Sequence, residues 1–148
     1  MLSSRLSSLT LLLLLTSLPG CGGQSASPTQ FSSAEAAYEN ARVSFEKQDY
    51  ATAENAVKTA LESGTLPPDL VESSLLLRAR SLTQLGKLPE AEAELQQLQN
   101  TAANLDQVWL AVAELKMKQN IPMAAREAVQ QARKINPRIA IPPGLPKP

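Results

Sequence analysis

Trp109–Pro137, WLAVAELKMKQNIPMAAREAVQQARKINP, is the stretch of sequence that decides the fold. Apolar residues recur in it at helical spacing, and nothing in it alternates with a period of two. Pro122 fits the first turn of a second helix, where a missing N–H costs nothing, and Asn136-Pro137 ends that helix. The stretch therefore predicts two consecutive helices joined by a short turn.

The same pattern occurs twice more toward the N-terminus. Its markers are two series of alanines that keep one register, with intervals of 38 and then 34 residues in each series: Ala41, Ala79 and Ala113, and Ala53, Ala91 and Ala125. The longer first interval indicates an insertion of four residues around 65–68. Because the two series are independent, their shared register indicates three copies of one helix–turn–helix unit.

Capping and turn residues divide the chain at matching places. Ser32-x-x-Glu35 and Asp69-x-x-Glu72 both fit a capping box, in which two side chains satisfy free backbone amides. Pro89 fits the first turn of a helix, as Pro122 does. Gly64 and Gly86 fit helix ends. The sequence thus predicts an all-α domain over 33–137.

The composition of the chain argues against several classes of protein. The chain has 148 residues, 3% aromatic residues and no net charge, which favours one close-packed helical domain and argues against a nucleic-acid binder. It has no histidine and one cysteine. The commonest general base is therefore missing, and neither an intrachain disulfide nor a thiolate metal cluster can form. We expect a protein that is not an enzyme and has no cofactor or metal.

The repeated unit resembles the tetratricopeptide repeat (TPR) over roughly 34–139. Trp109, Val112 and Ala113 are similar to the family's Trp-x-x-Leu-Gly signature, and Pro137 closes the unit at the family's distance. The resemblance implies a right-handed α-solenoid of about three TPR-like helix hairpins, in which small residues let paired helices approach closely. About three such units are needed for stability. A Pro-rich tail, 138–148, would follow the domain.

The resemblance also implies a binding groove along the first helix of each unit. Its register positions are Tyr38, Arg42, Phe45, Leu76, Leu77, Arg80, Leu110, Ala111, Glu114 and Met117. An apolar groove with two arginines suits an extended or helical peptide that carries a carboxylate. In the alternative interpretation, the arginines are only solvated. The family's chaperone-tail clamp uses Lys and Asn on this surface, and neither type occurs at these positions.

The N-terminal residues 1–20 have the layout of a secretory signal peptide. Arg5 precedes an apolar run that is shorter than the about 20 residues of a spanning helix. Leu18-Pro19-Gly20-Cys21 resembles the bacterial lipobox, which implies that Cys21 is lipidated, with an acyl chain such as palmitate. Residues 21–32 would be the lipidated Cys and a flexible tether. The alternatives are simple secretion with an unmodified thiol, or an uncleaved anchor.

Two features of the C-terminal part leave alternatives open. The tail could be a polyproline ligand, a disordered end, or a cover for the last helix. Residues 22–105 hold six basic and eleven acidic side chains, whereas 106–148 hold seven basic and three acidic ones. This polarity could orient the domain near an anionic surface or favour head-to-tail self-association, or it could have no role. The oligomeric state is not predicted.

These observations predict a membrane-anchored protein–protein interaction module, a TPR scaffold or adaptor of the bacterial cell envelope. It would face the periplasm and bind an envelope protein or peptide. The outer membrane is favoured, because Gly22 provides no acidic retention signal. The alternative is a pilotin-like assembly factor for a secretion or pilus component. An envelope hydrolase would need a nucleophile with its base, and the chain has no histidine.

Overall fold

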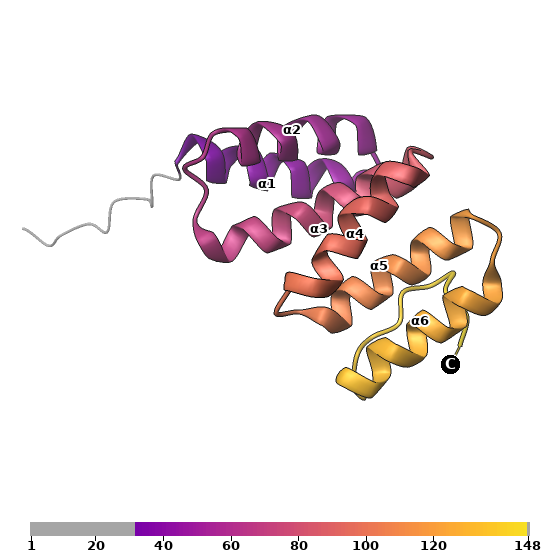
Figure 1. The fold of residues 1–148 in the computed structure, drawn as a ribbon. Helices are drawn as coiled ribbons and strands as arrows, with labels where there is room; N and C mark the ends of the chain where they lie inside the picture. The colour runs from indigo at the N-terminus through magenta and orange to yellow at the C-terminus, as the bar shows by residue number, and fades with distance from the viewer. Residues whose placement is uncertain (1–31, 148) are drawn as a thin grey trace, which may run out of the picture. The chain divides into compact units, whose positions relative to one another are not determined.

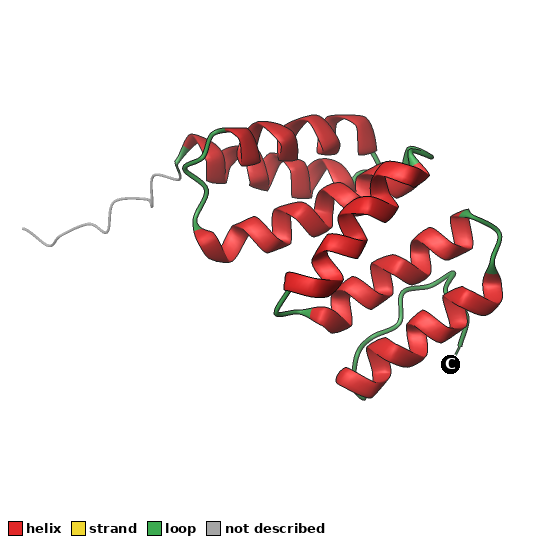
Figure 2. Cartoon of the chain, viewed as in Figure 1, coloured by secondary structure: helices red, strands yellow, loops and turns green. Residues whose placement is uncertain are grey.

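A computed structural model describes residues 32–147 of the chain. The predicted signal peptide, Cys21 and the tether up to residue 31 lie outside the described residues. The described part contains six α-helices and no strand, and Figures 1 and 2 show how the helices are arranged. The helices are α1 (Ser33–Glu46), α2 (Tyr50–Glu62), α3 (Pro68–Gln84), α4 (Leu88–Thr101), α5 (Leu105–Lys118) and α6 (Pro122–Ile135). The predicted all-α fold class is confirmed, and the right-handed superhelical geometry stays a prediction.

The six helices pack as consecutive pairs. α1 packs on α2, α3 on α4, and α5 on α6. Each following pair contacts both helices of the one before, since α3 touches α1 and α2, and α5 touches α3 and α4. The first helices of the three pairs therefore form one continuous row, α1–α3–α5.

The two alanine series form the centre of this packing. All six of these alanines have 0% of their surface exposed. Leu82, Leu95 and Leu115 pack with two of them, Ala79 and Ala91, in one core cluster and are at most 1% exposed. A methyl group is the largest side chain that lets two helix backbones approach closely, which is why alanine recurs at these register positions.

Most of the predicted helix ends match the structure. The Ser32 hydroxyl accepts from the Glu35 amide, and the Glu35 carboxylate accepts from the Ser32 amide, which completes the first capping box. Gly64 and Gly86 follow α2 and α3 with φ of +66° and +77°. This left-handed backbone favours glycine.

The second predicted capping box is wrong. Pro67 is the N-cap of α3 and Pro68 its first residue, so Asp69 already lies inside the first turn. Glu72 instead accepts hydrogen bonds from the backbone amides of Ala103 and Asn104, at 2.8 and 2.9 Å, just before α5. The side chain that was expected to start its own helix therefore stabilises the start of the first helix in the next pair.

The four inserted residues lengthen both the loop between α2 and α3 and the start of α3. The loop 63–67 is longer than the equivalent loop 102–104, and α3 begins earlier in the register than α1 and α5. Leu66 from this loop is buried against Ala34 and Ala60. The insertion therefore contributes to the core of the first pair.

The Pro-rich tail is folded back onto the last pair. After α6 ends at Ile135, the chain has turns but no helix and runs back along α5 and α6 (Figure 1). Ile139 is 7% exposed within the α5–α6 core. None of the described helices is both long enough and apolar enough to cross a membrane.

Candidate functional site

The first part of the α1–α3–α5 row carries a shallow pocket between α1 and α3. Its volume is about 230 Å³. Five predicted groove residues line it together with Ser73, which was not predicted: Tyr38, Arg42, Leu76, Leu77 and Arg80. We call it the α1–α3 pocket. It combines a half-buried aromatic ring, two half-buried leucines and two guanidinium groups.

Arg42 forms its ion pairs within its own helix. Its Nη2 and Nε lie 2.6 and 3.0 Å from the Glu39 carboxylate oxygens, and its Nη1 bonds to Glu46. Hydrogen bonding to Arg42 holds the pKa of Glu39 below its usual value. The Arg42 side chain is nevertheless 46% exposed. Because pairs of this kind on a helix surface are weak, its charge stays accessible to a ligand.

Arg80 joins three helices. It forms two parallel hydrogen bonds to Glu114 on α5, with Nε–Oε2 at 2.9 Å and Nη2–Oε1 at 2.7 Å. Its guanidinium carbon lies 5.0 Å from the centre of the Phe45 ring on α1, a distance at which the cation is attracted to the ring face. Phe45 in turn packs edge-on against Tyr50, at 5.3 Å between ring centres. Two predicted groove residues, Phe45 and Glu114, thus hold Arg80 in place.

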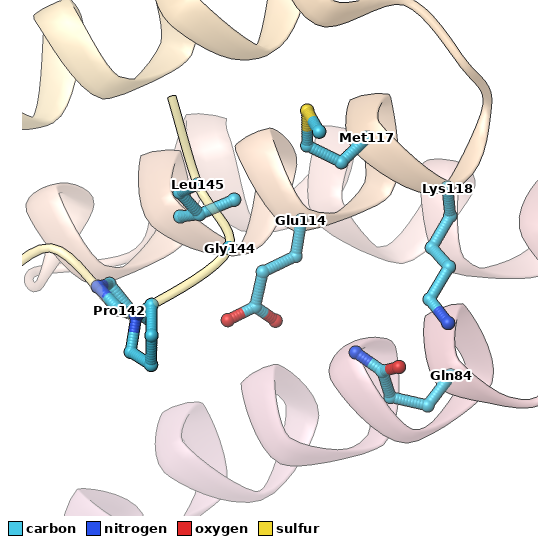
Figure 3. Close-up of a pocket in the computed structure, with 8 residues that line it drawn as sticks. Gln84, Glu114, Met117, Lys118, Pro142, Gly144 and Leu145 are labelled. Carbon is cyan, nitrogen blue, oxygen red and sulfur yellow. The ribbon is translucent and has the colours of Figure 1, made fainter. Parts of the chain in front are cut away.

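The last part of the row is shared with the tail. Leu110 and Ala111 are buried. Ala140 and Pro142 line a cavity of about 80 Å³ with Leu76, Arg80 and Glu114. Farther along, tail residues 142–145 face Gln84, Glu114, Met117 and Lys118 across a pocket of about 290 Å³. Figure 3 shows the Glu114 carboxylate pointing into the space between α5, α3 and the tail. All nine predicted groove positions and Ala111 therefore lie along one row, and of the pockets described along it only the α1–α3 pocket has no tail residue in its lining.

The position of the tail along this row was not predicted from the sequence. The signal that was present is the apolar pattern Ile139, Ile141 and Leu145. This pattern has no helical period and contains prolines, so it indicates burial without indicating a partner.

Two acidic residues of α4 have separate partners. Glu92 accepts a hydrogen bond from Lys116 on α5 at 2.8 Å, and Glu94 forms a salt bridge with Arg78 on α3, with 2.8 Å between Oε1 and Nη1. Burial raises the pKa of Glu94, and the nearby Arg78 opposes that rise. Within residues 32–147, no group of three or more acidic, His or Cys side chains is placed to hold a metal ion. Glu92 and Glu94 therefore link α4 to α5 and to α3.

Comparison with known proteins leaves the family open. No protein-family model matches the sequence, and neither a curated protein nor a solved structure is significantly similar to it.

Proposed function

We propose that this chain is a membrane-anchored protein–protein interaction module, a TPR-like scaffold or adaptor of the bacterial cell envelope. It binds a segment of an envelope protein on the α1–α3–α5 row. The observation that carries the proposal is the α1–α3 pocket, where Tyr38, Leu76 and Leu77 are only half-buried beside Arg42. Aromatic and arginine side chains together are typical of surfaces that bind proteins.

Arg42 is the residue for which a ligand carboxylate fits best. The guanidinium of Arg80 is held by Glu114 of another helix and is 34% exposed, whereas Arg42, which pairs with exposed Glu39 and Glu46 of its own helix, is 46% exposed at the edge of the pocket. A carboxylate bound there would make charge-assisted hydrogen bonds, which are among the stronger polar contacts in proteins. The ligand we propose is therefore a peptide segment with an apolar side chain for the pocket and a carboxylate beside Arg42.

The anchor is proposed from the sequence. Leu18–Cys21 supports lipidation of Cys21 and hence a periplasm-facing membrane lipoprotein, with the outer membrane favoured. The second candidate, a pilotin-like assembly factor, uses the same anchor and the same pocket. It would carry one subunit of an envelope machine to the outer membrane, and binding of a single such subunit would favour it.

Site-specific photo-crosslinking in cells tests the binding surface. A photoreactive amino acid is placed at Ser73 in the α1–α3 pocket and, as a matched control, at exposed Gln97 on α4. We expect one discrete adduct from position 73 and none from 97. Equal adducts from both positions, or none from either, would contradict the proposal.

A titration of the crosslinked partner's peptide then tests the role of Arg42. Arg42→Ala should weaken binding by roughly ten- to a hundredfold, as expected for the loss of one charge-assisted contact. Arg126→Ala, on the exposed side of α6, is the control and should bind as the parent does. If only the Arg126 variant lost affinity, the site would lie elsewhere.

A further inference from the structure

The tail ends its path on the same row that the proposed partner would use. Ile139 is buried, and Ile141 and Leu145 are half-buried, against a cluster that includes Leu110 and Val129. Leu110 is a groove position of the third unit, equivalent in register to Leu76 in the α1–α3 pocket. On the third unit, the tail therefore covers groove positions equivalent to those that line the open pocket between the first two units.

Apolar side chains attach the tail to the helices. The hydrogen bonds of its backbone are local: the Ile139 amide donates to the Asn136 carbonyl at 3.0 Å, and the Leu145 amide donates to the Pro142 carbonyl at 3.3 Å. In the described chain, no hydrogen bond joins residues 139–147 to α3 or α5. Displacing the tail beyond Ile139 would thus leave no buried polar group of these helices without a partner.

The fit of the tail against α3 is incomplete. The cavities of about 80 and 290 Å³ both lie beside Pro142. The smaller one shares Leu76 and Arg80 with the α1–α3 pocket, and both cavities share Glu114. The three spaces therefore follow one another along the row, and the tail occupies only part of the space at its far end.

We propose that residues 140–147 are an internal ligand of the α1–α3–α5 row, and that the partner is an extended segment of the same chemistry. Such a segment carries aliphatic residues separated by prolines, and it binds by displacing the tail. This inference rests on the proposed function. It adds the chemical class of the partner and identifies the tail as the segment that competes with it for the row. Prolines keep the segment extended before it binds, which lowers the entropy lost on binding.

Because the tail is tethered to its site, the strength of its competition with a free peptide can be predicted. A segment joined to its site by a short linker has an effective concentration in the millimolar range. A free peptide with the tail's sequence must therefore compete with a large local concentration of the same sequence. It should bind the intact chain much more weakly than it binds a chain whose tail has been released.

The experiment uses the full chain in detergent and a fluorescein-labelled peptide of residues 138–148, RIAIPPGLPKP. The released form carries Ile141→Asp and Leu145→Asp, which place charges against the apolar cluster and leave buried Ile139 unchanged. The matched control is Arg126→Asp on α6, an exposed site outside the tail where one substitution changes the net charge by the same amount. Fluorescence anisotropy gives the affinity of each protein, with a scrambled peptide as the specificity control.

We expect the released form to bind the peptide about tenfold or more tightly than the parent and the Arg126 variant do. Equal affinities for the three proteins would overturn the proposal, as would the absence of specific binding to the released form at about 1 mM peptide. If circular dichroism showed that the double variant is unfolded, Ile141→Ser with Leu145→Ser would replace it under the same criteria.

The two proposals fail separately. Peptide binding by the released form without any adduct at position 73 in cells would retain the internal ligand and reject the binding function. An adduct at position 73 without peptide binding would retain the function and reject the tail as a ligand.

Discussion

The guanidinium of Arg80 and the carboxylate of Glu114 pair through two hydrogen bonds across 34 residues, which is the length of one repeat. The two positions are equivalent on α3 and α5, and stacking of the units brings them side by side. Arg42 is the equivalent position on α1, yet it pairs with Glu39 and Glu46 of its own helix. One register position thus provides a bridge between units in one place and an accessible cation in another.

This difference predicts unequal effects on stability. Glu114 is 12% and Arg80 34% exposed in the side chain, so the pair is less screened by solvent than a surface pair. Arg80→Ala and Glu114→Ala should each lower the free energy of unfolding by about 1–3 kcal/mol. A double-mutant cycle by urea unfolding should give a coupling of about 1–2 kcal/mol.

Arg42→Ala is the comparison, and we expect no measurable loss of stability because the Arg42 side chain is largely solvated. A coupling between Arg80 and Glu114 within experimental error would show that the pair does not join the units. A loss from Arg42→Ala as large as that from Arg80→Ala would contradict the distinction between the two arginines.

Glu72 predicts acid sensitivity at the start of α5. Hydrogen bonds from the Ala103 and Asn104 amides lower the pKa of Glu72. A carboxyl group whose pKa is lowered by folding stabilises the protein above its unfolded pKa, about 4.3 for Glu, and this contribution is lost as the pH falls through the folded pKa. Glu72→Gln should therefore destabilise the protein by roughly 1 kcal/mol at pH 7 and have a smaller effect near pH 3.

Urea unfolding at both pH values measures this difference, with Glu62→Gln as an exposed control. An effect of Glu72→Gln that is the same at pH 7 and pH 3 would mean that the charge of Glu72 does not act on these amides.

Glu94 predicts the opposite sign. Burial raises its pKa, the charge of Arg78 opposes the rise, and the carboxylates of Glu54 and Glu90 add to it. A carboxyl group with a raised folded pKa contributes stability below its unfolded pKa that is lost as the pH rises through the folded value. Glu94→Gln should therefore leave the urea midpoint at pH 7 unchanged or higher. A clear fall at pH 7 would show that the ion pair with Arg78 outweighs the burial of the carboxylate.

The helices could be predicted because the regularly spaced alanines mark the positions where two helix backbones meet. A position at which two helix backbones meet accepts little more than a methyl group, so the series of alanines follows directly from the packing. The same register would have predicted the bridge between Arg80 and Glu114, since opposite charges at equivalent positions of adjacent units must lie close together.

Two features were not predicted from the sequence. The expected capping box at Asp69 was wrong because α3 begins at Pro68, two residues earlier than such a box requires, and this left Glu72 free to reach the next pair. The path of the tail could not be predicted because its prolines exclude a helix. The surface that it covers is formed only after α5 and α6 have packed.

Lipidation of Cys21 is the prediction on which the proposed location depends. Cys21→Ala should move the protein from the membrane fraction to the soluble periplasmic fraction or block its processing. Without the acyl chains, too little apolar surface would remain to hold the membrane. Mass spectrometry of the parent's N-terminal peptide should show acyl mass on Cys21. An unmodified peptide, together with a variant as membrane-bound as the parent, would rule out the anchor.

The last prediction concerns the number of units. A chain that ends at Asn104 lacks α5 and α6, and so exposes the face of the α3–α4 pair that α5 covers. Leu82, Leu95 and Leu98 belong to the core cluster shared with α5, and each is at most 2% exposed in the whole chain. Exposing a buried leucine costs about 1.5–3 kcal/mol, so three of them approach the total stability of a small domain, about 5–15 kcal/mol. The shortened chain should therefore melt at a much lower temperature and over a broader range by circular dichroism.

A chain that ends at Pro137 separates this effect from the loss of the tail, and it should keep a co-operative transition, because all six helices remain. A two-pair chain that melts as sharply and at as high a temperature as the full domain would show that the pairs are independently stable, contrary to the coupling expected of a repeat array.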